Sequence, residues 1–267
     1  MIDTMDLQLT GKRAFVSGST QGIGFAIAHA LAAEGATVVL NGRSSTGVAA
    51  AVTRLEAQVP GARVSGIAAD FGDASSVQAL VDRLGEVDIL VNNVGLFEVA
   101  PFADLTDDDW QRYFDVNVMS AVRLSRHALV GMLARGSGRV IFVSSESGVN
   151  VPADMVHYGV TKAGMLALSN GLSKLTKGTT VTVNTILGGP TYSDGVASAV
   201  AGIAQAQGIP ERDLTAAIIA GNQTSLLERF IEPVEIAHLA TYLASPLSSA
   251  TNGAALRADG GVLTTIL

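Results

Sequence analysis

A tyrosine and a lysine stand one helical turn apart in the segment YGVTK, as Tyr158 and Lys162. Residues four apart on a helix project from the same face, so this spacing would bring the phenol and the amine together. A free tyrosine has a pKa of about 10 and carries protons poorly at neutral pH. A positive charge about 4 Å away contributes about 4 kcal/mol at an effective dielectric near ~20, and one pKa unit is ~1.36 kcal/mol. We therefore expect Lys162 to lower the pKa of Tyr158 and make it a general acid and base. For the pair alone, a tyrosine packed in the core beside a solvated lysine is the simpler interpretation.

A glycine-rich turn stands near the start of the chain and indicates a nucleotide site. The segment SGSTQGIG places Gly18, Gly22 and Gly24 between an expected strand and an expected helix. Glycines there permit a tight turn and let backbone N–H groups approach a pyrophosphate at the positive end of the helix. The spacing Gly-x-x-x-Gly-x-Gly differs from the more familiar Gly-x-Gly-x-x-Gly, and glycine-rich turns are common. Its place at the start of a βαβ unit nevertheless favours dinucleotide binding.

The residues at the end of the second expected strand indicate which dinucleotide binds. The segment VVLNGRS offers Asn41, Arg43 and Ser44 where an NAD-binding domain would present a carboxylate to the ribose 2′-OH. A carboxylate would repel a 2′-phosphate, whereas a guanidinium can bind it through two charge-assisted hydrogen bonds. We predict NADP(H) as the preferred cofactor. NAD(H) is the alternative, because an ordinary surface arginine at a loop tip, with no role in binding, would give the same sequence pattern.

The elements that must position these residues alternate along the chain. Short runs rich in Val and Ile predict buried strands, and the segments between them have apolar residues at helical spacing. Such alternation gives a parallel sheet with helices on both faces. The predicted fold class is therefore α/β: a Rossmann-like, doubly wound, seven-stranded parallel sheet in one domain over residues 1–267. The expected strands are 13–18, 37–40, 63–70, 87–93, 138–145, 180–186 and 253–261, and the expected helices are 22–35, 47–59, 75–86, 107–136 and 157–178.

The segment 188–225 departs from this alternation. It is long, rich in small residues and bracketed by glycines. Long connections in compact domains are usually functional or flexible, so we predict a mobile substrate lid, with two ordinary surface helices as the alternative. An apolar pocket wall is expected from its larger side chains, which are Tyr192, Ile203, Ile209, Leu214, Ile218 and Ile219.

Composition excludes several other classes of protein. The net charge is −7 and no run of Lys or Arg exists to neutralise phosphates, so nucleic acid is not an expected partner. The absence of cysteine excludes disulfides and thiolate metal sites, and the four histidines show no ligand spacing, so no catalytic metal is predicted. The N-terminal segment lacks an apolar stretch, and no run of about 18 apolar residues occurs anywhere. These features predict a cytoplasmic protein with no signal peptide and no membrane partner.

Eight motifs, in their order and spacing, resemble the short-chain dehydrogenase/reductase family along nearly the whole chain. The resemblance is to its NADP-dependent carbonyl and 3-oxoacyl reductases. The motifs are SGSTQGIG (17–24), AADF (68–71), NNVG (92–95), DVNV (115–118), VSSESG (143–148), YGVTK (158–162), VNTILGG (183–189) and DGG (259–261).

The resemblance implies a catalytic tetrad, which consists of Asn117, Ser145, Tyr158 and Lys162. Either Ser144 or Ser145 could supply the hydroxyl, and the family spacing selects Ser145. In the implied roles, Ser145 binds the substrate carbonyl and Tyr158 protonates its oxygen. Lys162 lowers the tyrosine pKa and holds the ribose hydroxyls, while Asn117 fixes a water that links Lys162 to solvent.

The resemblance also implies contacts with the cofactor. They fall on Gly18, Ser19, Thr20, Gln21, Gly22, Ile23, Gly24, Arg43, Ser44, Asp70, Phe71, Asn93, Gly95, Tyr158, Lys162, Gly189 and Thr191. Asp70 and Phe71 match positions beside the adenine, and Asn93 is alternatively a structural residue that pins neighbouring strands. The family's usual Pro-Gly after the sixth strand is replaced by Gly188-Gly189, which frees the backbone at the hinge of the predicted lid.

Taken together, these features predict an NADP(H)-dependent reductase that interconverts a small-molecule carbonyl and a secondary alcohol. The alternatives are a reductase of 3-oxoacyl thioesters, an NADP(H)-sensing protein without chemistry, and a dehydratase or epimerase. The C-terminal segment around Asp259 often packs across subunits in this family, so a homo-oligomer, a dimer or tetramer, is also expected. Two neighbours of the tetrad are expected to be passive: His157 as a satisfied or partly exposed structural histidine, and Glu146 as a surface carboxylate at a strand end.

Overall fold

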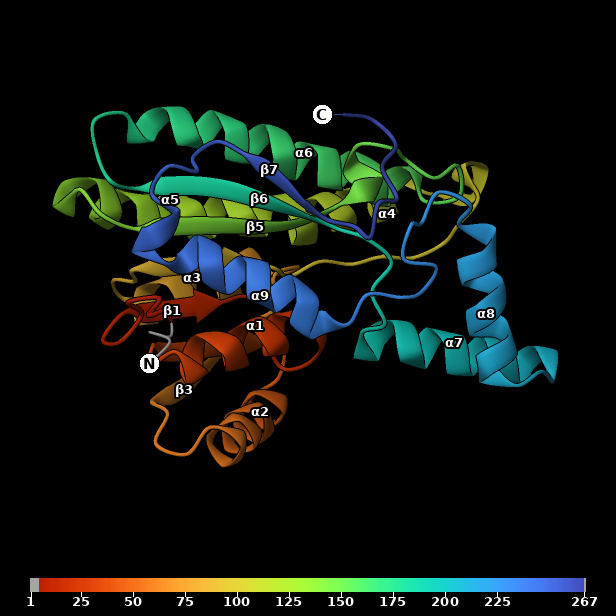
Figure 1. Cartoon of the computed structure of the whole chain (residues 1–267), viewed down its shortest axis with the longest axis horizontal. Helices are drawn as coiled ribbons and strands as arrows, with labels where there is room; N and C mark the ends of the chain where they lie inside the picture. Colours follow the sequence, from red (N-terminus) through yellow and green to blue (C-terminus); the bar gives the residue numbers. More distant parts are fainter. Residues whose placement is uncertain (1–4, 267) are drawn as a thin grey trace.

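Seven parallel strands form the sheet at the centre of the computed structural model, which describes residues 5–266 (Figure 1). Their spatial order is β3-β2-β1-β4-β5-β6-β7. The strands are β1 (Arg13–Val16), β2 (Thr37–Gly42), β3 (Val64–Ala68), β4 (Ile89–Asn92), β5 (Arg139–Ser145), β6 (Thr182–Gly188) and β7 (Ala255–Ala258). The predicted α/β class, the seven strands and their parallel arrangement are confirmed.

The strand order reverses between β1 and β4, which lie side by side at the centre of the sheet. From β1 the chain winds outward through β2 to β3, and from β4 it winds the other way through β5 and β6 to β7. In open α/β sheets, ligands bind outside the carboxyl ends of the strands at such a reversal. The ends of β1, β4 and β5 are therefore where the site must be sought.

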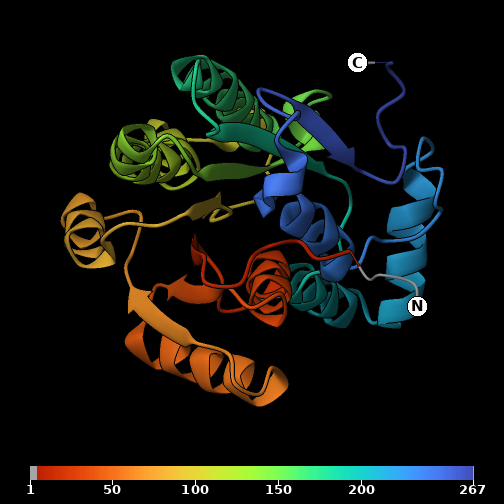
Figure 2. The same ribbon diagram turned by 60° about the vertical axis from the view of Figure 1, so that its left-hand side comes forward.

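Helices cover both faces of the sheet (Figures 1 and 2). One face is covered by α1 (Gly22–Ala33), α2 (Ser45–Gln58) and α9 (Pro233–Ala244), and the other by α3 (Ala74–Leu84), α5 (Ser120–Arg135) and α6 (Val156–Ser173). Alternate strand residues point to opposite faces, so Val38 and Leu40 lie in the first core while Val39 lies in the second. Within residues 5–266, no helix is both long and apolar enough to cross a membrane.

The predicted helix over 107–136 is divided in the structure. It begins as α4 (Asp107–Tyr113), continues through a π-helical turn, η2 (Phe114–Met119), and resumes as α5. The hydroxyl of Thr106 accepts a hydrogen bond from the Asp109 N–H at 3.2 Å and so caps the start of α4. A π-turn inside a helix often marks a functional position, and this one carries Asn117.

The segment 188–225 contains two helices, α7 (Asp194–Gln207) and α8 (Glu211–Gly221), which project beyond one end of the sheet (Figures 1 and 2). We call α7 and α8 together the helical hairpin. The structure therefore has two helices where a lid or two surface helices were expected, and their action as a lid stays a prediction. Helix α9 was missing from the sequence interpretation, although Pro233 at its first position and Glu235 in its first turn are start signals.

Candidate active site

The end of β5 and the first two turns of α6 bring together three of the predicted catalytic residues. Ser145 is the last residue of β5, and Tyr158 and Lys162 face it from α6. The Lys162 Nζ lies 5.5 Å from the centre of the Tyr158 ring and donates a hydrogen bond to the Val143 carbonyl at 3.0 Å. Lys162 is 5% exposed, so it is a buried residue rather than the solvated surface lysine of the simpler interpretation.

Close contact between η3 (Glu146–Gly148) and α6 depends on glycine. A Cβ on Gly148 would lie 2.9 Å from the backbone carbon of Lys162, closer than real Cβ atoms approach. The segment after β5 can therefore lie directly on the backbone of α6, which holds Ser145 against the helix that carries Tyr158.

The fourth predicted residue, Asn117, lies buried in the π-turn and joins two segments. Its Oδ1 accepts from the Leu96 N–H at 2.7 Å, and its Nδ2 donates to the Leu96 carbonyl at 3.1 Å and to the Thr161 hydroxyl at 2.9 Å. A Cβ on Gly95 would meet the Lys162 Nζ at 3.4 Å and the Asn117 Oδ1 at 3.5 Å. Asn117, Gly95 and Lys162 therefore converge at one place.

The two adjacent serines have different roles. The Ser144 hydroxyl donates to the Lys162 carbonyl at 3.0 Å and so binds the backbone of α6. The Ser145 hydroxyl donates to the Glu146 carboxylate and accepts from the Ser147 N–H at 3.1 Å. It also forms a hydrogen bond that lowers the pKa of Tyr158. Ser145, the residue selected by the family spacing, is thus the serine that faces the tyrosine.

The expected direction of the pKa shift of Tyr158 is wrong. Burial raises the pKa of Tyr158 above its ordinary value; the hydrogen bond with Ser145 opposes this rise and the charge of Glu146 adds to it. Burial also lowers the pKa of Lys162 to about 8, against the opposing effect of Glu146. Burial disfavours both the phenolate and the ammonium, and the spacing of two residues on a helix says nothing about their burial.

Glu146 is also placed differently from the expectation. It is only partly exposed, its carboxylate accepts the hydrogen bond from Ser145, and burial raises its pKa. Sequence reasoning treated it as a surface residue at a strand end. The available signal was its position directly after the predicted catalytic serine.

His157 is fully buried and is neither satisfied nor partly exposed. Within residues 5–266, neither ring nitrogen has a hydrogen-bond partner. The ring packs edge-on against Tyr113, with centroids 4.2 Å apart, and burial lowers the pKa of His157. A neutral packing residue fits this environment better than a proton carrier.

The glycine turn after β1 is tightly wound. Gly18 has a φ of +61°, and a Cβ on Gly24 would lie 2.3 Å from the Gly18 carbonyl oxygen, so neither position admits a larger residue without rearrangement. The Asn93 Nδ2 donates to the carbonyls of Ser17 and Gly18, at 3.0 Å each. This bonding favours the structural alternative for Asn93, which fastens the turn to the end of β4.

Residues 19–23 of the turn divide into an inner and an outer set. The Ser19 hydroxyl donates to the Val16 carbonyl at 2.7 Å and accepts from the Asn41 N–H at 2.9 Å, so this side chain joins β1 to β2 and is fully buried. The outer residues, each partly or fully exposed, are Thr20, Gln21, Gly22 and Ile23. Their backbone N–H groups are better placed than the Ser19 hydroxyl to meet a ligand.

The residues predicted around the nucleoside lie at the ends of β2 and β3. Arg43 and Ser44 are exposed, and the Ser44 hydroxyl caps α2 by accepting from the Gly47 N–H at 3.1 Å. Asp70 is exposed, whereas the Phe71 ring is 3% exposed and packs in the core beneath α3. Of the two residues predicted beside the adenine, only Asp70 presents its side chain to solvent.

The segment after β6 returns to the glycine turn. Gly189 donates its N–H to the Ala258 carbonyl at 3.1 Å, and the Thr191 hydroxyl donates to the Gly189 carbonyl at 2.9 Å. The carboxylate of Asp194, the first residue of α7, accepts from the Gly22 N–H at 2.6 Å. The start of the helical hairpin thus contacts the start of α1, a contact that sequence reasoning missed because the two residues lie far apart along the chain.

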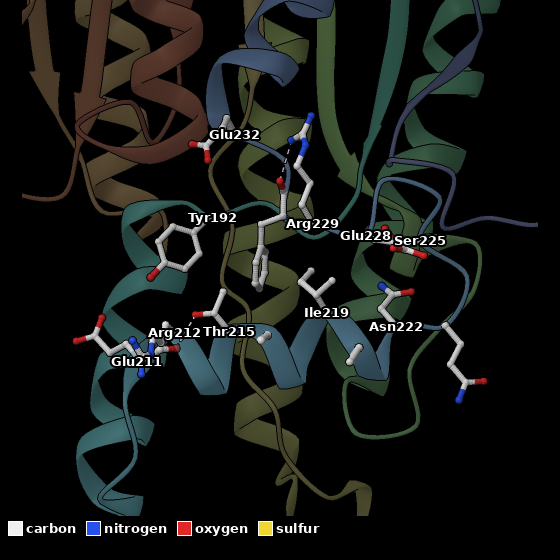
Figure 3. A pocket seen from close by; sticks show the side chains of 14 residues that line it. Tyr192, Glu211, Arg212, Thr215, Ile219, Asn222, Ser225, Glu228, Arg229 and Glu232 are labelled. Atoms are coloured by element: carbon white, nitrogen blue, oxygen red, sulfur yellow. Dashed lines mark hydrogen bonds between the residues drawn. The ribbon is translucent and has the colours of Figure 1, made fainter.

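A cavity of about 980 Å³ lies between α8 and residues 222–232 (Figure 3). Tyr192 and Ile219, both expected in a pocket wall, line it, and the Tyr192 ring lies 5.4 Å from that of Phe230. None of the four predicted catalytic residues lines this cavity. Among the residues that the structure describes, no group of three or more His, Asp or Glu could hold a metal ion.

Comparison with known proteins assigns the family. The family model described as short chain dehydrogenase matches residues 12–204. This match covers more than half of the chain, and the chain therefore belongs to the short chain dehydrogenase family of oxidoreductases. The resemblance identified from the sequence is confirmed.

Individual relatives cover nearly the whole chain. It is 44% identical to the uncharacterized oxidoreductase YvaG of Bacillus subtilis, over 98% of this chain and 100% of the relative. It is 31% identical to a 3-oxoacyl-[acyl-carrier-protein] reductase of Vibrio harveyi, over 96% and 99% of the two chains. A solved structure of L-sorbose reductase from Gluconobacter frateurii, complexed with NADPH and L-sorbose, is similar with a TM-score of 0.92 and 32% identity, over 98% of this chain and 100% of that one.

Proposed function

We propose that the protein transfers hydride between NADP(H) and a small carbonyl or secondary alcohol, with Tyr158 as the general acid and base. The observation that carries the proposal is the cluster of Ser145, Tyr158 and Lys162 at the carboxyl end of β5. This cluster lies on the same edge of the sheet as the glycine turn, as a dinucleotide bound across the strand reversal would require.

The chain's own residues suit such a cofactor. Backbone N–H groups at the start of α1 would bind the pyrophosphate, and the tight turn at Gly18 and Gly24 leaves no side chain in their way. Gly95 and Lys162 would lie beside the nicotinamide riboside. The nicotinamide would supply or accept the hydride.

The protein would handle the proton. Ser145 would hold the substrate oxygen, and Tyr158 would donate a proton to it in reduction or accept one in oxidation. Lys162, whose pKa burial lowers to about 8, can bind and release a proton near neutral pH and so restore Tyr158. Asn117 fixes the segment after β4 against α6, which supports a positioning role beside Lys162.

NADP(H) is the preferred cofactor in this proposal. Arg43 is exposed at the end of β2, and no carboxylate accompanies it in the segment NGRS. A guanidinium there would bind a 2′-phosphate. The bound NADPH in the L-sorbose reductase structure agrees with this preference.

We propose a free small ketone or sugar as the substrate, in preference to a carrier-bound thioester. A protein carrier needs a basic rim, and the candidates for one in this chain are the arginines at 123, 126, 135 and 139. Arg139 is buried and donates to the Thr180 carbonyl at 2.7 Å, and Arg135 is bonded to the Val87 carbonyl. Arg123 lies 3.6 Å from a carboxylate oxygen of Asp115, so three of the four are already paired.

Homo-oligomerisation and a cytoplasmic location stay predictions.

Replacing Tyr158 tests the enzymatic proposal. NADPH oxidation should be followed with a panel that includes L-sorbose, cyclohexanone and an acetoacetyl thioester. Tyr158→Phe should reduce kcat by at least about 10²-fold, because the general acid is lost, while NADPH affinity measured by fluorescence stays nearly unchanged. Activity retained in this variant would contradict the role of Tyr158. Tight NADPH binding with no turnover on any carbonyl would instead favour an NADP(H)-sensing protein.

Replacing Arg43 tests the cofactor preference. Arg43→Ala should weaken NADPH binding by about tenfold or more and leave NADH binding nearly unchanged, since only NADPH carries the 2′-phosphate. Binding of both cofactors can be titrated by fluorescence, with the exposed Arg126→Ala as a matched control. Equal losses for the two cofactors would exclude a contact with the 2′-phosphate.

A further inference from the structure

The carboxylate of Glu146 controls the hydroxyl that is proposed to hold the substrate oxygen. The Ser145 hydroxyl donates its proton to Glu146 Oε2 and accepts from the Ser147 N–H at 3.1 Å. Glu146 begins the short turn η3 directly after β5, so its side chain lies at the site and not on the outer surface of the fold.

These contacts limit what Ser145 can offer a ligand. A hydroxyl has one proton to donate and two lone pairs that accept. The proton is held by Glu146 and one lone pair by Ser147, so one lone pair is left, and a ligand would share it with the neighbouring Tyr158. A lone pair can accept a hydrogen bond from an alcohol, but a ketone oxygen is itself an acceptor and needs the proton.

Resting on the proposed function, we propose that Glu146 is a positioning residue that sets the direction of the Ser145 hydrogen bond. When the carboxylate is ionised it holds the Ser145 proton, and the site favours a secondary alcohol. When the carboxyl group is neutral it accepts that proton more weakly and can itself donate to Ser145, so the site favours a ketone. Glu146 transfers no proton to the substrate, since that step belongs to Tyr158.

The surroundings of Glu146 allow both states. Its hydrogen-bond donors are Ser145, Ser147 and its own backbone N–H, and the ionisable groups that interact with it are Tyr158 and Lys162 of α6. Burial raises the pKa of Glu146 and brings its neutral form closer to working pH, while its hydrogen bonds to the serines favour the ionised form. The charge of Lys162 also favours ionisation. A change of about one pH unit around this balance would alter the population of the two states.

Binding without turnover tests the proposal directly. Cyclohexanone added with oxidised cofactor, and cyclohexanol added with reduced cofactor, form no product, so each affinity can be measured by calorimetry from about pH 5 to pH 9. In the native protein the ratio of ketone Kd to alcohol Kd should rise by roughly tenfold across this range, about the value of one charge-assisted hydrogen bond. In Glu146→Gln, which keeps the shape and removes the charge, the ratio should be lower at high pH and should lose most of its dependence on pH.

A structural role alone would change both affinities in the same direction. Parallel changes for ketone and alcohol, or a ratio in Glu146→Gln that still follows pH as in the native protein, would overturn the proposal. Because the measurement requires no turnover, it can also be made in Tyr158→Phe, which separates failure of this proposal from failure of the proposed catalytic role.

A second measurement needs no substrate at all. With ¹³C-labelled glutamate, the Glu146 carboxyl signal can be assigned by its loss in Glu146→Gln and titrated by NMR. Ser145→Ala should raise the pKa of Glu146, because a donor to the ionised form is lost. Ser144→Ala is the matched control, since its hydroxyl donates to the Lys162 carbonyl, and it should leave this pKa unchanged. No shift in Ser145→Ala would exclude the contact on which the proposal depends.

Discussion

The carboxyl end of the sheet and the helical hairpin differ in how they are held. Every residue of β5 and of β6 is buried, Ser145 ends β5, and Tyr158 and Lys162 face it from α6. In the hairpin, α7 buries Val200 and Ala204, and α8 buries no residue. Segments with few buried apolar contacts open locally at low cost. The difference suggests that the sheet end fixes the chemistry, while the hairpin can move without disturbing it.

The packed region carries an electrostatic cost that the hairpin does not. Lys162 is 5% exposed and its pKa is lowered to about 8, so its charged form is destabilised in the folded protein. The ionisable groups of α8, such as Glu211 and Arg212, are exposed instead. Natural proteins commonly keep such unfavourable groups only where function requires them.

Of the proposed substitutions, Lys162→Met should change the free energy of unfolding most. It would measure the cost of burying the ammonium group. Between about pH 8 and 10.5 the folded protein binds fewer protons than the unfolded chain, so the free energy of unfolding rises with pH across this window and is lowest below it. Methionine removes the charge and keeps most of the volume. We expect the free energy of unfolding at pH 7 to increase by about 2 kcal/mol, after the lost bond to Val143 is subtracted, and its rise with pH to disappear.

Urea unfolding at several pH values would check this prediction. The exposed Lys177→Met is a matched control and should change the free energy of unfolding by less than about 0.5 kcal/mol. A Lys162→Met protein that is less stable than the native one would show that the bond to Val143 outweighs the cost of burial.

Asp194→Asn addresses the contact between the two regions and should have an intermediate effect. The Asp194 carboxylate accepts from the Gly22 N–H at 2.6 Å, at the helix start where a pyrophosphate would bind, so the two anions would repel each other. Asparagine keeps the shape and removes the charge. NADPH and NADH should therefore both bind about three- to tenfold more tightly, in contrast to the selective effect of Arg43→Ala.

Fluorescence titration of both cofactors would measure the change, with Asp213→Asn at the exposed start of α8 as the control. Weaker binding in Asp194→Asn would mean that the contact supports the bound state. The hairpin would then have to be regarded as part of the binding site and not as a separate segment.

A pair of glycine replacements should have the smallest effect and tests whether the hairpin unfolds separately. Gly202 in α7 and Gly171 in α6 are both exposed, and a Cβ added at either would meet nothing within 4 Å. Alanine should stabilise each helix by about 0.5–1 kcal/mol. Gly171→Ala should raise the global Tm, whereas Gly202→Ala should slow amide exchange in α7 with little change in Tm. An equal rise in Tm for both variants would show that the hairpin folds together with the sheet.

Much of this architecture could be predicted from local patterns. Runs of Val and Ile located the strands because buried parallel strands need apolar side chains on both faces. The cap at Thr106 is a signal of the same local kind, because capping depends on residues three apart. The π-turn that carries Asn117 could not be predicted, since it inserts a single extra residue into a continuous helical pattern.

The candidate site likewise has features that local patterns predict and features that depend on the tertiary structure. The spacing of Tyr158 and Lys162 was sufficient to place them on one face, and the order of the motifs was sufficient to identify the family. Neither the spacing nor the order of the motifs was sufficient to predict that Phe71 would pack into the core, that His157 would lack hydrogen-bond partners, or that Glu146 would bind Ser145. Each of these depends on which residues from distant segments become neighbours.

The sequence by itself determined the parallel sheet, the glycine turn and the set of groups able to carry a proton, because all of these follow from short-range spacing and side-chain chemistry. Only the tertiary structure decided the protonation behaviour of those groups. Burial raises the pKa of Tyr158 and lowers that of Lys162, and it brings a carboxylate to the serine beside them. The free energy of a charge depends on the atoms that surround it, and those atoms come from segments that the chain brings together only when it folds.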